Sequence, residues 1–196
     1  MNRLELLKKL EKYVVFEALQ LEGILDKTRR YSYLIIHRLK KAGLIHEIEN
    51  GKYSIYEDPF LIASRITWPS YISSWAALRY WGLTEQLPRT IHVVCPKKRK
   101  KNKIKYGNAN IEFIKTKQEY FFGYTRVLYQ EKEIFIAEIE KAIIDSLLFR
   151  KISFPEAIEI IKNNRKKINI KKLLKFSKVK EKLARKIRGE LNDRSR

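Results

Sequence analysis

Hydrophobic and polar positions between residues 28 and 43 repeat with the period of an α-helix. Thr28 or Asp26 can cap the start of this predicted helix, and Gly43 stands where a helix C-terminus is favoured. The face predicted to be buried consists of Tyr31, Leu34, Ile35, Leu39 and Ala42. The opposite face, predicted to be exposed, consists of Arg29, Arg30, Tyr33, His37, Lys40 and Lys41, with Arg38 at its flank.

A β-hairpin is predicted directly after this helix. Residues 44–49 and 52–56 alternate like strands, and Asn50-Gly51 between them is typical of a type I′ turn. Two shorter helices are predicted upstream, near residues 3–12 and 15–21, with Gly23 at the turn before the basic helix. This is the order of a winged helix-turn-helix, whose recognition helix enters a DNA major groove. The alternative is a helix packed on a hairpin, with a basic face that contacts only water.

The chain changes character after residue 58. Glu57-Asp58-Pro59 interrupts the hairpin pattern and predicts a domain boundary. A short helix is expected over residues 60–66, and a longer one from an N-cap at Ser70 to a stop at Gly82. We interpret the aromatic side chains of the longer helix as core residues rather than as a platform for stacked bases. Strands are expected at 90–95, 110–115, 121–129 and 133–137, and a helix at 138–150.

The C-terminal part is predicted to be helical and basic. Ser153 and Glu156 have the spacing of a capping box, which predicts a helix through residue 161. Two basic amphipathic helices follow near 170–176 and 178–188, with a stop at Gly189. The sequence therefore predicts an α+β fold in three parts. These are a winged helix-turn-helix over 1–58, a mixed α/β domain over 59–154 and a basic helical extension over 155–196.

Composition limits the class of protein. Apolar residues make up 44% of the 196 residues, enough for a hydrophobic core. The longest apolar runs are far shorter than the ~20 residues of a membrane span, and the N-terminus is typical of an amphipathic helix rather than a signal peptide. The single cysteine, Cys95, excludes an intramolecular disulfide and is expected to be buried. A cytoplasmic protein is expected.

The net charge of +21 predicts a polyanionic partner. Residues 1–60 hold 11 Lys+Arg and 9 Asp+Glu, residues 61–154 hold 17 and 8, and residues 155–196 hold 15 and 5. A densely basic run from Lys97 to Lys105 is expected to form an exposed loop or hairpin tip. A lysine-rich composition selected for heat stability is the alternative, but it predicts matching glutamates, which this chain lacks.

Three blocks of sequence resemble those of the AbiEi-type antitoxins, which are also described as transcriptional regulators. The first block is Pro69-Ser70-Tyr71-Ile72-Ser73 followed by small residues, Ala77-Leu78, an aromatic pair and Gly82-Leu83. The second is Tyr120-Phe121-Phe122-Gly123-Tyr124. The third runs from Ala137 to Asp145 and includes Glu140-Lys141-Ala142. The resemblance covers about residues 1–150.

This resemblance implies a protein of two functional parts. The winged helix would bind the promoter of its own operon, and the following domain would counter a nucleotidyltransferase-like toxin encoded next door. Antitoxins of this family usually act without a stable complex with the toxin. The oligomeric state stays open, because one monomer at each half of an inverted repeat and a dimer are both compatible with the sequence.

Candidate catalytic chemistry is sparse. The sequence has no Gly-rich phosphate loop, no HExxH and no His/Cys set with metal spacing, so no catalytic residue, metal site or cofactor is predicted. Glu138, Glu140 and Asp145, with Glu112 as a further candidate, would be the residues of a nuclease-like alternative. We interpret Glu140 and Asp145 more simply as a helix surface, with Asp145 able to bond a backbone group. His92 is expected to be a hydrogen-bonded structural residue.

The favoured function is therefore a DNA-binding regulator with an antitoxin domain. Arg29, Arg30, Tyr33 and His37, next to Thr28, would contact base edges or nearby phosphates, and Arg38, Lys40 and Lys41 would hold the backbone. Lys52 on the wing would reach a minor groove or a phosphate. A second phosphate clamp would come from Lys97, Lys98, Arg99, Lys100 and Lys101. The alternative is an RNA-binding or toxin-neutralising module that uses the basic C-terminal surface.

Overall fold

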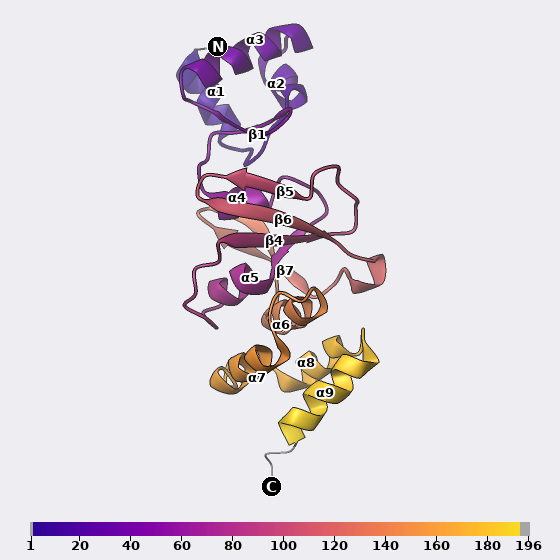
Figure 1. Ribbon diagram of the computed structural model, residues 1–196. Helices are drawn as coiled ribbons and strands as arrows, with labels where there is room; N and C mark the ends of the chain where they lie inside the picture. Colours follow the sequence, from indigo (N-terminus) through magenta and orange to yellow (C-terminus); the bar gives the residue numbers. More distant parts are fainter. Residues whose placement is uncertain (1, 193–196) are drawn as a thin grey trace.

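The computed structural model describes residues 2–192, which form N-terminal helices with a small hairpin, a six-stranded sheet and C-terminal helices (Figure 1). The N-terminal part contains α1 (Arg3–Leu10), α2 (Ala18–Leu25), α3 (Arg29–Lys41), β1 (His46–Glu49) and β2 (Lys52–Ser54). The middle part contains α4 (Pro59–Ala63), β3 (Tyr71–Ser73), α5 (Ser74–Tyr80), β4 (Thr90–Cys95), β5 (Lys103–Tyr106), β6 (Ala109–Lys115), the 3-10 turn η1 (Gln118–Tyr120), β7 (Tyr124–Tyr129) and β8 (Lys132–Ala137). The C-terminal part contains α6 (Ile139–Leu148), α7 (Phe154–Asn163), α8 (Ile170–Ser177) and α9 (Glu181–Asn192).

The basic helix α3 begins and ends where local sequence chemistry favours it. Thr28 caps its start, with the side-chain oxygen accepting from the backbone N–H of Tyr31. At the other end Gly43 has φ +66°, and the N–H of Leu44 donates to the carbonyl of Leu39. This is the hydrogen-bonding pattern of a Schellman motif, which satisfies the last carbonyls of a helix. The stop predicted at Gly43 is confirmed.

Two predictions for the N-terminal part are wrong. Gly23 lies inside α2, and the helix ends instead at Asp26, whose φ of +52° places it in the left-handed region. The turn at Asn50-Gly51 has positive φ only at Gly51, so it is not of type I′. Positive φ at two consecutive residues occurs instead at Gln130 and Glu131, between β7 and β8.

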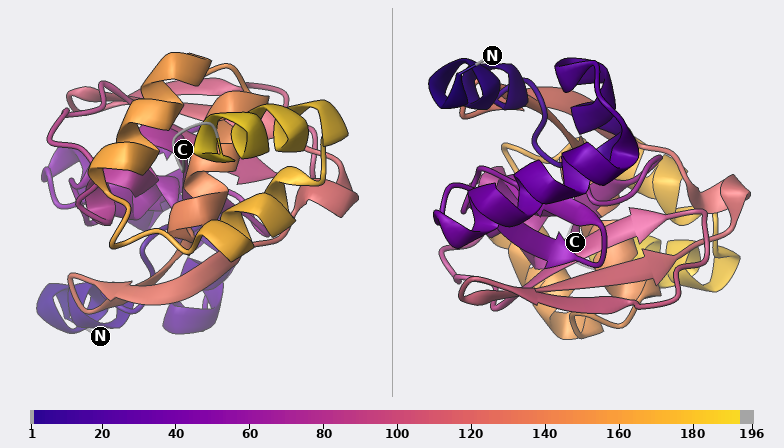
Figure 2. Two further views of the ribbon diagram at one scale, coloured as in Figure 1. Left: turned by 90° about the horizontal axis from the view of Figure 1, so that it is seen from below. Right: turned by 90° about the horizontal axis from the view of Figure 1, so that it is seen from above.

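The six strands form one mixed sheet in the order β5-β6-β4-β3-β8-β7. Strand β4 pairs in parallel with β6, β3 pairs in parallel with β8, and the other neighbours are antiparallel. Helices α5 and α6 pack on this sheet, α8 packs on α6, and α9 on α8. Figure 2 shows from below how α7, α8 and α9 cover the end of the molecule opposite the N-terminal helices and hairpin.

The centre of the sheet contains an element that the sequence pattern did not predict. Residues 71–73 form β3, so the helix expected from Ser70 begins only at Ser74, and the Ser70 hydroxyl donates to the carbonyl of Thr67. Strand β5 was also not predicted, because its residues were assigned to the basic loop. Gly189, expected as a helix stop, lies within α9. Strand β4, the stop at Gly82 and the capping box of Ser153 and Glu156 are confirmed.

The hydrophobic core is organised as two clusters. A smaller one joins α1, α2, α3 and the hairpin through residues such as Leu10, Phe16 and Leu21. A larger one contains Val14 and Ile48 of the N-terminal part together with residues from Leu61 to Ile187, so it continues across the boundaries predicted at 58–59 and at 154–155. Cys95 lies within the larger cluster and is buried. Within the part of the chain described, helices long and apolar enough to span a membrane are absent.

Candidate nucleic-acid interface

Helix α3 buries a narrower face than its apolar pattern predicts. Ser32, Ile36 and Leu39 face the core, whereas Tyr31 and Leu34 are 41% and 43% exposed. Ala42 is also exposed. The prediction that these three residues are buried is therefore wrong. The small, fully buried Ser32 takes the core-facing position, which turns the larger Tyr31 and Leu34 toward solvent.

The exposed face of α3 carries a continuous stripe of side chains. Arg30, Leu34, His37 and Lys41 are spaced four, three and four residues apart, so they follow one side of the helix. All four are exposed, as is Arg38 at their flank. Within residues 2–192 the side chains of Arg30, His37, Arg38 and Lys41 make no hydrogen bond or ion pair with the protein. Their donors are therefore available to a ligand.

Two other basic residues of α3 are held by neighbouring acids. The Arg29 Nε atom lies 2.7 Å from Glu22 Oε1, and Lys40 pairs with Glu47. The hydrogen bonds to these carboxylates raise the pKa of Arg29 and of Lys40. Arg29 and Lys40 therefore stabilise the packing of α2 and β1 around α3 more directly than Arg30 and Lys41 do. Tyr33, which is half exposed, is the remaining predicted base-reading residue.

The tip of the hairpin is bound to the sheet and does not project freely. Lys52 Nζ lies 2.9 Å from Glu49 Oε1 and donates to the carbonyl of Ile66 at 2.6 Å. Glu49 Oε2 accepts from Arg99 Nη2 at 2.6 Å, and the Arg99 guanidinium lies 4.0 Å from the centre of the Phe113 ring. Burial opposes the ionisation of Glu49, but hydrogen bonds from Arg99 and Lys52 outweigh it and lower the pKa.

Lys52 and Arg99 were both predicted to contact nucleic acid. In the structure both join the hairpin to neighbouring segments, so their charges are already paired. The other four residues of the predicted clamp, Lys97, Lys98, Lys100 and Lys101, are exposed on the loop that follows β4. Of the residues predicted to contact nucleic acid, the exposed and unpaired ones within residues 2–192 lie on α3 and in the loop after β4.

The three blocks that carry the family resemblance meet at one buried position. From the first block, the Tyr71 hydroxyl and the Ser73 hydroxyl donate to Asp145 Oδ2 at 3.0 and 2.8 Å. Asp145 belongs to the third block, and its Oδ1 atom lies 2.8 Å from Lys141 Nζ. Lys141 Nζ also donates to the carbonyl of Tyr120, in the second block, at 2.9 Å. We call Tyr71, Ser73, Lys141 and Asp145 the buried motif cluster.

Packing leaves no room for a substrate at this cluster. The side chains of Lys141 and Asp145 are fully buried, and Lys141 Nζ lies 4.4 Å from the centre of the Phe122 ring. Gly123 has φ +70°, and a Cβ atom there would lie 3.2 Å from Lys141 Cβ. Burial raises the pKa of Asp145 against the opposing effects of Lys141, Ser73 and Tyr71, and it raises that of Tyr71. The geometry is that of a structural cluster.

The carboxylates of the nuclease alternative do not converge. Asp145 bonds within the buried motif cluster, Glu138 pairs with Lys172, and Glu140 Oε1 accepts from the backbone N–H of Asn169. The expectation that Glu140 and Asp145 form a helix surface is wrong, because both are buried. Among residues 2–192, groups of three or more His, Cys, Asp or Glu side chains suited to a metal ion are absent.

His92 lies in a second buried polar group on β4. Its Nε2 atom is 3.4 Å from Glu112 Oε2, and Lys151 Nζ is 3.1 Å from the same oxygen. Burial, followed by the positive charge of Lys151, lowers the pKa of His92 to about 4, although Glu112 acts in the opposite direction. Lys103 adds a further, smaller lowering. The imidazole is therefore neutral at pH 7 and serves the packing of β4 against β6.

No family model matches the chain, and no curated protein matches its sequence. The resemblance to AbiEi-type antitoxins therefore depends on the three sequence blocks themselves.

Breaking the buried ion pair should strongly destabilise the protein. We expect Asp145→Asn to lower the free energy of unfolding by about 3–5 kcal/mol, because it leaves the Lys141 charge buried without its partner. Chemical denaturation of the variant and the wild type measures this difference. The matched control is Glu5→Gln, which breaks an exposed pair with Lys9 at the same spacing and should cost less than about 1 kcal/mol. Equal losses in both variants would contradict the structural role of the cluster.

Acid should destabilise the protein through His92. Because its pKa is about 4 in the folded chain and ordinarily 6.5, the unfolded chain binds the proton more tightly. The stability that His92 contributes is present above pH 6.5 and is lost as the pH falls towards 4, by at most about 3 kcal/mol. Denaturation curves between pH 7 and pH 4 should therefore fall less steeply for His92→Gln than for the wild type. Parallel curves would show that His92 does not cause the acid sensitivity.

Proposed function

We propose that the protein is a DNA-binding transcriptional regulator that uses α3 as its recognition helix. One observation carries the proposal: α3 presents a stripe of basic and hydrogen-bonding side chains that the fold itself does not use. Helix α3, which carries the stripe, lies at one end of the molecule (Figure 1). A helix of this kind, following a short turn from α2, has the geometry that enters a major groove.

The contacts follow from the position of each side chain. Arg30 and His37 stand on the stripe where they can donate to base edges, and arginine pairs best with the O6 and N7 atoms of guanine. Lys41 and Arg38, toward the end of the helix, would bind phosphates and set the register. Leu34 offers an apolar contact, suited to a thymine methyl group. The hairpin supports α3 from behind and makes no contact of its own in this arrangement.

We further propose that this regulator is the antitoxin of a toxin-antitoxin operon. The winged helix would bind inverted repeats in its own promoter, and the domain around the sheet would counter a nucleotidyltransferase-like toxin. The support is the resemblance of three separate blocks, which the fold brings into one buried motif cluster. Residues that share one buried arrangement are more informative than three unrelated short matches, because a common fold requires them together. A cytoplasmic location fits a DNA partner.

Removing charge from the stripe should abolish the preference for the operator. For the double variant Arg30→Ala and Lys41→Ala, we expect affinity for the protein's own upstream DNA to fall about 100-fold, and the salt dependence to weaken by about one phosphate contact. The reason is the loss of a base contact together with a phosphate contact. Binding to upstream and random duplexes over a salt series measures both quantities.

The matched control is Lys166→Ala with Lys171→Ala. It removes the same charge from two exposed lysines near the opposite end of the molecule. Operator binding should be almost unchanged. An equal loss in both double variants would mean that binding is a general attraction of the +21 charge. A loss in the control alone would favour the alternative, an RNA-binding or toxin-neutralising surface on the C-terminal helices.

The antitoxin role should be separable from DNA binding. We expect the full chain to restore growth of cells that express the toxin encoded beside it. The Arg30→Ala, Lys41→Ala variant should restore growth equally well, because its sheet and C-terminal helices are intact. Colony counts with and without each variant measure the effect. Failure of the wild-type chain to restore growth would reject the antitoxin role and leave the DNA-binding proposal standing.

A further inference from the structure

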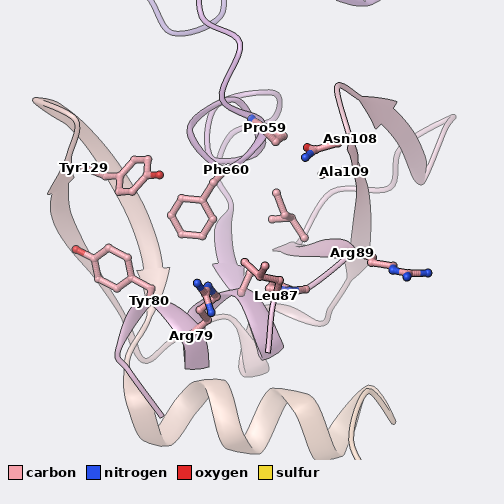
Figure 3. A pocket seen from close by; sticks show the side chains of 12 residues that line it. Pro59, Phe60, Arg79, Tyr80, Leu87, Arg89, Asn108, Ala109 and Tyr129 are labelled. Carbon is pink, nitrogen blue, oxygen red and sulfur yellow. The ribbon is translucent and has the colours of Figure 1, made fainter. Parts of the chain in front are cut away.

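A pocket of about 400 Å³ opens between α4, α5 and the sheet (Figure 3). Its volume falls in the range of pockets that hold small molecules. One wall is aromatic and is formed by Phe60, Tyr80 and Tyr129. The polar groups around it are Arg79, Arg89 and Asn108, and none of the lining residues is acidic. The position and chemistry of this pocket are independent of the α3 stripe and of the buried motif cluster.

The aromatic side chains of the wall pack against one another. The rings of Phe60 and Tyr80 are nearly parallel, with centroids 6.1 Å apart, and Tyr129 is tilted against Phe60 at 5.0 Å. The Tyr129 hydroxyl donates to Asp58 Oδ2 at 2.8 Å. Burial and this carboxylate raise the pKa of Tyr129 to about 12, so the donor is retained at every physiological pH. A flat, apolar ring is the ligand body that such a wall favours.

A positive charge stands beside this wall. Figure 3 shows Arg79 below Phe60, between Tyr80 and Leu87, while Arg89 is directed away toward the rim. Arg79 Nη1 donates to the carbonyl of Glu85 at 2.5 Å, which orients the guanidinium and leaves its other N–H groups for a ligand. Arg89 and Asn108 make no side-chain hydrogen bond within residues 2–192. An anionic group on the ligand would therefore meet one fixed guanidinium, with a second at the entrance.

The pocket borders the segment that leads from the hairpin into the sheet. Asp58 caps α4 by accepting from the backbone N–H of Phe60 at 2.8 Å, and its other oxygen accepts from Tyr129 and Gln130. Phe60 therefore belongs both to the pocket wall and to the connection between the two parts of the chain. A ligand that moves Phe60 would act directly on this connection.

We propose that this pocket binds a small planar aromatic anion, a ring bearing a carboxylate or a phosphate, and that its occupancy changes the affinity of α3 for DNA. The proposed binding site is inferred from the residues that line the pocket. The regulatory effect rests on the proposed function. Because coupling between two sites is reciprocal, the DNA must change the affinity for the anion by the same factor.

Calorimetric titration of the full chain with salicylate and with adenosine 5′-monophosphate tests the site. The two probes share a flat ring and an anion but carry a carboxylate and a phosphate respectively. We expect at least one to bind with a Kd below about 1 mM, and the uncharged salicylamide or adenosine to bind at least about tenfold more weakly. Binding of one probe alone identifies the anion that the site prefers. No saturation by either probe at about 10 mM, or equal binding of the uncharged analogue, would overturn the site.

Two variants test whether the probe binds in this pocket. Arg79→Met keeps the apolar stem of an exposed side chain but removes the guanidinium, so affinity for the bound probe should fall at least about tenfold. Arg126→Met removes an exposed guanidinium on β7 that does not line the pocket, and should leave the affinity unchanged. Equal affinities for Arg79→Met and the wild type would place the probe elsewhere and reject the assignment.

The regulatory part is tested by the affinity for upstream DNA with and without saturating probe. A change of about threefold or more in the wild type, absent in Arg79→Met, is expected. Unchanged DNA affinity despite Arg79-dependent probe binding would overturn the regulatory effect and keep the site. Absence of specific DNA binding under all conditions would reject the proposed function and the regulatory effect together. The calorimetric titration would still test whether the pocket binds the anion.

Discussion

The buried ion pair between Lys141 and Asp145 is the constraint on which most of this structure depends. Moving two charges out of water costs several kcal/mol each, so such a pair is tolerated only with good geometry and with its remaining hydrogen bonds made. Here Asp145 Oδ2 accepts from two hydroxyl groups of β3, and Lys141 donates to the carbonyl of Tyr120, before β7. Strand β3 has only three residues, yet it lies at the centre of the sheet. Its register against α6 is set by these hydrogen bonds as well as by apolar packing.

The same cluster positions the C-terminal helices. Next to Lys141, Glu140 accepts from the backbone N–H of Asn169, the residue that caps α8. Close packing at Gly123 brings Lys141 near Phe176 of α8. The C-terminal helices are therefore attached to the middle of the molecule through α6 and are part of its core. Most residues of the first and third sequence blocks are buried, so these blocks support the fold and form little exposed surface.

The sequence predicted the elements that are determined by residues close to one another along the chain. The Schellman stop at Gly43, the capping box at Ser153 and the alternating residues 90–95 each involve neighbours in sequence, and each is confirmed. Strand β3 was missed because three residues are too few to show a period of two. The buried face of α3 was predicted incorrectly because it includes the polar Ser32, while the apolar Tyr31 and Leu34 are exposed.

Long-range partners account for the rest of the differences at the candidate site. Lys52 and Arg99 have the composition of a nucleic-acid surface, but their common partner, Glu49, lies 50 residues from Arg99. The sequence alone does not distinguish a basic residue that pairs with an acid from another element from a basic residue that is unpaired. The pocket could not be predicted from the sequence for the same reason. Its lining comes from segments between residues 59 and 129 that share no local motif.

The attachment of the hairpin to the sheet constrains how the +21 charge can be used. Glu49, Lys52 and Arg99 hold the N-terminal helices and hairpin in place, with α3 at one end of the molecule and α8 and α9 at the other (Figure 1). A straight duplex that contacts α3 would run across one end and could not reach the opposite one. If the proposed DNA binding is correct, the basic residues of the C-terminal helices would act on the DNA only at long range. They cannot add contacts to the same stretch of DNA unless the DNA bends around the protein.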